Sequence, residues 1–102
     1  MSIGAPSYRD SNTETLAGTK TLTFNDARTQ VLDPGGGNRN VVLPAETNGI
    51  EVFISNTADA SENLVVQEDG ASTTIVTISQ DEDAVLTSDG SGWVAVLSKG
   101  AT

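Results

Sequence analysis

Carboxylates are the only abundant side chains in this sequence that suit chemical work. The 102 residues include 14 Asp and Glu, five Lys and Arg, and neither His nor Cys. Without these two residues the chain has no imidazole base, no thiolate nucleophile and no Cys-ligated or His-ligated metal site. Two carboxylates can catalyse glycoside hydrolysis, but so many acids form pairs by chance, and so short a chain has little room for a cleft. The composition predicts a protein that is not an enzyme and uses no cofactor.

The densest acidic run is Asp81-Glu82-Asp83, and Asp69 and Asp89 lie in neighbouring predicted turns. Ca²⁺ takes about six to eight oxygen ligands, which makes such a run a candidate site. The run lacks the ligand spacing of an EF-hand loop, and acids between strands are ordinarily solvated turn residues. We predict no resident metal, and the sequence leaves open whether this run binds Ca²⁺.

A glycine-rich segment, Gly35-Gly36-Gly37, follows Asp33-Pro34. A phosphate-binding loop of this kind needs a helix directly after it and usually a Lys. Here Asn38-Arg39-Asn40 and a predicted strand come next. The segment is therefore interpreted as a flexible hairpin connection.

Short runs rich in Val, Ile and Thr predict the structure that positions these motifs. Eight runs are separated by Gly, Pro, Asn and Asp, at 19–24, 29–32, 39–43, 50–54, 64–67, 74–78, 84–87 and 93–97. This pattern predicts an all-β fold, a compact antiparallel sandwich or small barrel of about eight short strands. The Asp89-Gly90 pair predicts a hairpin with a turn wider than two residues. The expected core residues are Leu22, Phe24, Leu43, Ile54, Val66 and Trp93.

The first 18 residues show no regular period and contain Pro6. We predict an extended N-terminal arm over 1–18 and a β domain over 19–102. The arm nevertheless carries side chains that a purely solubilising tail would not need. Those expected to bind a partner are Ile3, Pro6, Tyr8 and Arg9.

Charge is unevenly distributed along the chain. Residues 1–44 are net neutral, whereas residues 45–102 carry ten acids and the single base Lys99, for a total net charge of −9. This asymmetry suits docking through the first part and an acidic exterior elsewhere, although acids that serve only solubility explain it as well. The charge argues against nucleic acid as a partner. No apolar run reaches the length of a membrane span, so no membrane partner is expected.

Four motifs, in order, resemble a small β module of tailed-bacteriophage structural proteins. They are Asn40-Val41-Val42-Leu43-Pro44, Phe53-Ile54-Ser55-Asn56, Leu64-Val65-Val66 and Ser88-Asp89-Gly90-Ser91-Gly92-Trp93. Each motif is common alone, and only the ordered set is specific. The resemblance covers roughly residues 19–97 and is greatest to head decoration (cement) proteins.

The resemblance implies a virion protein on the capsid exterior, made in the host cytoplasm. Its partners would be the major capsid protein and further copies of itself, with a homotrimer favoured, and it would stabilise the capsid by bridging neighbouring subunits. A trimeric tail-fibre or head-fibre tip that binds a host receptor is the first alternative. A carbohydrate-binding module is the second, disfavoured because aromatic residues make up only 4% of the chain.

Overall fold

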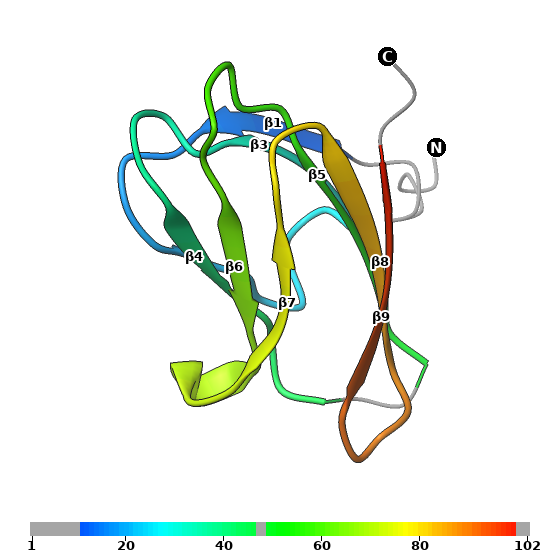
Figure 1. The fold of residues 1–102 in the computed structure, drawn as a ribbon. Helices are drawn as coiled ribbons and strands as arrows, with labels where there is room; N and C mark the ends of the chain where they lie inside the picture. Colours follow the sequence, from blue (N-terminus) through cyan, green and yellow to red (C-terminus); the bar gives the residue numbers. More distant parts are fainter. Residues whose placement is uncertain (1–10, 47–48, 100–102) are drawn as a thin grey trace, which may run out of the picture.

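A computed structural model describes residues 11–46 and 49–99. Over these residues the chain forms two mixed sheets packed as a sandwich (Figure 1), which confirms the predicted all-β sandwich and excludes a closed barrel. Ile3, Pro6, Tyr8 and Arg9 lie outside the described residues. The described elements are β1 Ser11–Thr15, β2 Lys20–Thr21, β3 Thr29–Asp33, β4 Arg39–Val42, β5 Glu51–Asn56, β6 Leu64–Gln67, the short 3₁₀ turn η2 Asp69–Ala71, β7 Thr74–Ile78, β8 Glu82–Ser88 and β9 Trp93–Lys99.

The first six strands alternate between the two sheets. β1, β3 and β5 are parallel neighbours in one sheet, and β2, β4 and β6 are parallel neighbours in the other. The chain thus winds as a flattened solenoid, in which one circuit takes 18 residues from Ser11 to its partner Thr29 and 24 from Thr29 to its partner Phe53. The prediction of an antiparallel arrangement was wrong for this part. Strand runs and turn residues look alike whether the chain folds back within a sheet or crosses to the opposite one.

The last three strands run antiparallel to their neighbours. β7 returns beside β6, β8 pairs with β5, and β9 pairs with β8. The five-stranded sheet therefore has the order β1-β3-β5-β8-β9, and the four-stranded sheet the order β2-β4-β6-β7. Ser88 pairs with Trp93 across four loop residues, which confirms the hairpin and its wide turn.

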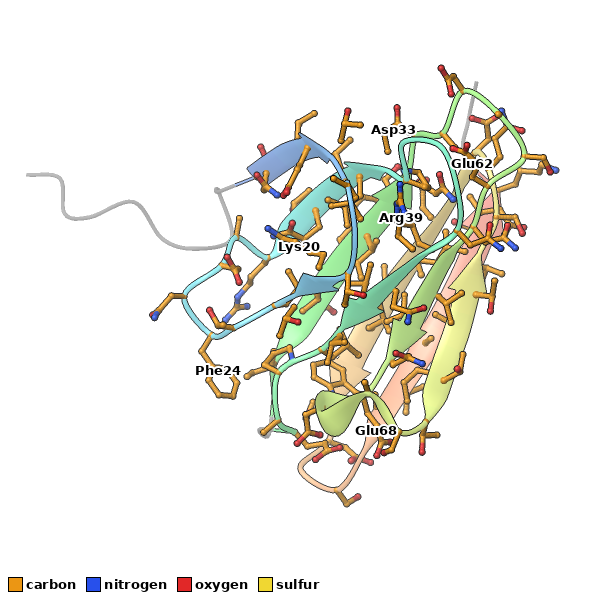
Figure 2. All side chains as sticks on the ribbon, turned by 90° about the vertical axis from the view of Figure 1, so that its left-hand side faces the viewer. Lys20, Phe24, Asp33, Arg39, Glu62 and Glu68 are labelled. Carbon is orange, nitrogen blue, oxygen red and sulfur yellow. The ribbon has the colours of Figure 1, made fainter. Side chains whose placement is uncertain are left out.

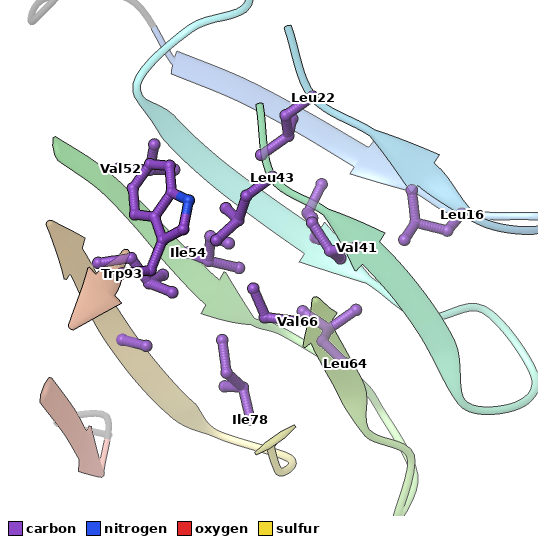
Figure 3. Packing of buried hydrophobic residues seen from close by; sticks show 13 residues of the cluster. Leu16, Leu22, Val41, Leu43, Val52, Ile54, Leu64, Val66, Ile78 and Trp93 are labelled. Carbon is purple, nitrogen blue, oxygen red and sulfur yellow. The ribbon is translucent and has the colours of Figure 1, made fainter. Parts of the chain in front are cut away.

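The core lies between the sheets (Figure 3). Five of the six predicted core residues are buried there, namely Leu22, Leu43, Ile54, Val66 and Trp93. Phe24 is 59% exposed, so that prediction was wrong. β2 ends at Thr21, and the turn that follows is fixed by the backbone N–H of Thr23, which donates to Asp26 Oδ2 at 2.7 Å. The turn breaks the alternation that would have placed Leu22 and Phe24 on the same face.

The predicted boundary between arm and β domain at residue 18 was wrong, because residues 11–16 already belong to the β domain. β1 pairs with β3 in parallel, and Leu16 behind it is buried in the core. The inner side of β1 is polar: Asn12 Nδ2 donates to Oε1 of the buried Gln30 at 2.9 Å. Because hydrogen bonds replace apolar contacts here, the segment lacks the alternation by which a strand is predicted.

Candidate docking surfaces

The carboxylates that the fold brings together are not those of the expected run. Among the described residues, two groups have carboxylate oxygens within 4.8 Å of one another: Asp33 with Asp59 and Glu62, and Glu46 with Glu68 and Asp69. Asp33 and Glu62 lie near Arg39 at one end of the sandwich, and Glu68 lies at the other end (Figure 2). In the run from 81 to 83, Glu82 instead accepts the backbone N–H of Ser79 at 2.8 Å and so closes a turn.

The glycine-rich segment is an ordered arch between sheets, so the interpretation as a flexible hairpin was wrong. It joins β3 of one sheet to β4 of the other. Arg39 fixes it, because its Nε donates to the carbonyl of the buried Pro34 at 2.8 Å and its Nη2 to that of Gly35 at 3.3 Å. Since a strand follows the arch, the segment lacks the helix N-terminus on which a phosphate cradle depends.

The end of the sandwich formed by β1 and β2 is polar. Lys20 on β2 and Glu14 on β1 form an ion pair of 2.9 Å between the two sheets. Hydrogen bonds from Asn12 and from Lys20 lower the pKa of Glu14 below its ordinary value of 4.5. Charged and amide groups therefore line this edge, which makes it a poor surface for apolar docking.

β1 and β9 are the two edges of the five-stranded sheet, and the β9 edge is apolar. β9 is the last strand of this sheet, and Val94, Val96 and Leu97 on it are 59%, 66% and 43% exposed. These are three of the four large hydrophobic side chains found exposed among the described residues. The run 93–97 contains no polar side chain, although an edge strand has only one covered flank. β9 therefore has more apolar side chains than burial within one chain requires.

The outer face of the five-stranded sheet continues this apolar surface inward from β9. Val96 pairs with Val85, Val85 with Phe53, and Phe53 with Thr29, which forms one row across four strands. Val94 lies on the same face, where it pairs with Thr87. We call the apolar residues of this face the outer patch. They are Val31, Phe53, Val85, Val94 and Val96.

A small pocket lies beside the exposed Phe24. It has a volume of about 80 Å³ and is lined by residues of the β2–β3 turn together with Pro44 and Val52. Sites for drug-sized ligands are typically about 300–1,000 Å³. The pocket fits a single side chain of a partner better than a substrate, with Asp26 and Arg28 providing charge at its wall.

Comparison with known proteins gives no further identification. Neither the known protein families nor the curated proteins include a match to this chain. No helix in the described part of the chain is long and apolar enough to cross a membrane. The sequence analysis missed the exposed apolar side chains of β9, although the five consecutive apolar residues 93–97 were an available indication of them.

Proposed function

We propose that this chain is a structural protein of a phage virion, which binds the outside of the assembled capsid and bridges neighbouring capsid subunits. The observation that supports assembly with other protein chains, rather than chemistry, is the exposed apolar surface on β9 and the outer patch, in a chain without His or Cys. The assignment to a phage depends on the resemblance of the four sequence motifs. All four motifs contribute to the core, through Leu43, Ile54, Val66 and Trp93.

The proposed mechanism is binding rather than chemistry. A protein that binds only the assembled shell stabilises that shell by mass action. Many copies on a symmetric surface gain further from multivalency. The ten acids of residues 45–102 would face solvent and oppose aggregation of decorated particles.

The capsid contact is assigned to the part of the arm that precedes β1. It contains Ile3, Pro6, Tyr8 and Arg9, which combine apolar, aromatic and cationic groups suited to anchoring at an interface. Ser11, which follows this part of the arm directly, is the first residue of the edge strand β1. An arm attached there is able to reach a neighbouring subunit without disturbing the core.

Deleting residues 1–10 tests this proposal. This deletion keeps β1 and the buried Leu16, so the circular dichroism spectrum should stay that of a β protein. The full chain should co-sediment with expanded, empty heads of its phage, and the deletion variant should not. The double variant Tyr8→Ala/Arg9→Ala should lose most of the binding, and Ser2→Ala should retain it.

Two outcomes would contradict the proposal. If the full chain does not bind heads, the capsid role is wrong, and binding to host cells instead would favour the fibre-tip alternative. If the variant lacking 1–10 binds heads with unchanged affinity, the arm is not the contact. The docking surface would then lie on the sandwich.

A further inference from the structure

Strand β9 has a free edge that the rest of the described chain leaves uncovered. We propose that a second copy of this chain docks there, with the two β9 strands antiparallel about a twofold axis at Ala95. The two five-stranded sheets would then form one continuous sheet. This inference rests on the geometry of β9 and does not depend on the capsid role.

The edges of the two sheets differ in how well they resist such pairing. Natural edge strands are commonly protected by charge, proline, bulges or short length. β1 presents Glu14 and Asn12, and β2 has only two residues. β7 exposes Thr74 and Thr77, and a bulge interrupts its pairing with β6. β9 has seven residues, no proline, no acid and a regular register with β8 along its whole length.

The pattern of side chains on β9 selects the register. In an antiparallel pair, opposite residues point to the same face, so the twofold axis must pass through a residue position. A centre at Ala95 pairs the apolar run 93–97 with itself. Val94 then lies opposite Val96 of the second copy, and Trp93 lies opposite Leu97. Each exposed apolar side chain of β9 gains an apolar neighbour in this arrangement.

Charge is complementary in the same register. Lys99 is the one base among residues 45–102 and stands at the end of β9. With Ala95 at the centre, Lys99 faces Ser91 of the second copy, in the turn that begins with Asp89. Hydrogen bonds from the backbone and hydroxyl of Ser91 and from the backbone of Gly92 lower the pKa of Asp89, so its carboxylate is charged at neutral pH. The strand itself places no acids against each other.

The net charge sets how this association depends on salt. Two chains of −9 repel each other at long range, whereas the strand contact acts at short range. Salt shortens the reach of that repulsion to about 8 Å at 0.15 M. The dimer should therefore strengthen as salt rises, which is the opposite of what an interface dominated by ion pairs would do.

A single introduced cysteine tests the register directly, because the natural chain has none. In Ala95→Cys the two thiols would face each other across the axis, with Cα atoms about 4.5–5.5 Å apart, which suits a disulfide. Mild oxidation should link most of this variant as dimers. Thr77→Cys, on the exposed edge of the other sheet, is the matched control and should remain unlinked. Equal linking of the two variants, or preferential linking of Val96→Cys, would overturn the proposed register.

Sedimentation velocity tests the association without a covalent bond. Val96→Lys places a charge in the apolar contact and should raise the dimer dissociation constant at least tenfold. Thr77→Lys adds the same charge on β7 and should leave the constant within twofold of the natural chain. A monomer at every concentration and salt would overturn the proposal. So would a trimer, because closed threefold symmetry requires unlike surfaces to meet.

Discussion

Three consecutive glycines in the β3–β4 arch separate two physical effects within one short segment. Gly35 has a φ of +75°, and a Cβ added there would lie 2.5 Å from the carbonyl oxygen of Leu16. Gly36 has a φ of +114°, but a Cβ on it would meet nothing within 4 Å. Gly37 has neither a positive φ nor a close neighbour. Replacement by alanine therefore adds both backbone strain and a clash at Gly35, and strain alone at Gly36. At Gly37 it adds neither.

The magnitudes follow from these contacts. A left-handed conformation costs a residue with a Cβ about 1–2 kcal/mol, and forcing an atom into an occupied space costs about 1–3 kcal/mol more. Gly35→Ala should thus lower the free energy of unfolding by about 2–5 kcal/mol. Strain alone predicts about 1–3 kcal/mol for Gly36→Ala. Gly37→Ala should be neutral, or stabilising by about 0.4–1 kcal/mol because alanine restricts the unfolded chain.

Urea unfolding followed by fluorescence measures these differences, since Trp93 is the only tryptophan and is buried in the core. The clash is with main chain, at Leu16 directly after β1, so the β1 end of the sandwich must shift to relieve it. If Gly35→Ala costs no more than Gly37→Ala, the arch does not press against β1 as described. If Gly35→Ala and Gly36→Ala cost the same, strain accounts for both and the close contact carries no energy.

Substitutions at three further positions test the core and the polar edge by denaturant unfolding. Trp93→Ala should lower the free energy of unfolding by about 3–5 kcal/mol. Trp93→Phe should lower it clearly less, because the indole N–H has no hydrogen-bond partner among the described residues; equal losses would contradict this. Asn56→Ala should cost about 3 kcal/mol or more. The buried amide donates from Nδ2 to the carbonyls of Glu62 and Ile78, and its Oδ1 accepts the N–H of Ala58. A cost under about 1 kcal/mol would refute that network. Glu14→Gln should cost about 0.5 kcal/mol at pH 7. Because folding lowers the pKa of Glu14, the carboxylate's contribution to stability is complete above pH 4.5 and is lost as the pH falls through the pKa of the folded state. The difference in unfolding free energy between the variant and the natural chain should therefore vanish in acid. A difference that persists there would contradict the ion pair.

The sequence predicted the strands better than it predicted their connections. β-branched runs locate β3 to β9 because burial between two sheets demands apolar side chains at alternate positions. They do not reveal that β3 continues through an arch into the opposite sheet, since Pro34 and Gly35 would suit a hairpin equally well. Phe24 was misplaced for a related reason: the hydrogen bond from Thr23 to Asp26 turns the chain after Leu22, and propensity alone does not detect such a turn.

Polar residues explain the other difference between prediction and structure. The sequence predicts that β1 belongs to the arm, because Ser11–Thr15 has no apolar alternation. Its place in the sheet depends on partners distant in sequence, Gln30 for Asn12 and Lys20 for Glu14, which appear only when the solenoid has closed. The candidate sites changed in the same way. The acidic run at 81–83 is conspicuous in the sequence, but the carboxylates that come together are distant in sequence, as where Asp33 at the end of β3 meets Asp59 and Glu62 of the β5–β6 loop.

The two edges of the five-stranded sheet differ in chemistry: the β1 edge is polar and the β9 edge is apolar. A solenoid with parallel strands can in principle add coils at either end, because each end strand has unpaired backbone groups. The Glu14–Lys20 pair and the short β2 oppose this at the first end, where apolar side chains would have to displace a charged layer. At the other end the chain reverses, β8 and β9 run antiparallel, and the final strand exposes Val94 and Val96. Reversal stops the winding of this chain, while the apolar edge leaves β9 able to pair with a strand from outside it. One polar edge and one apolar edge favour an assembly that closes after a second copy over a filament that grows without limit.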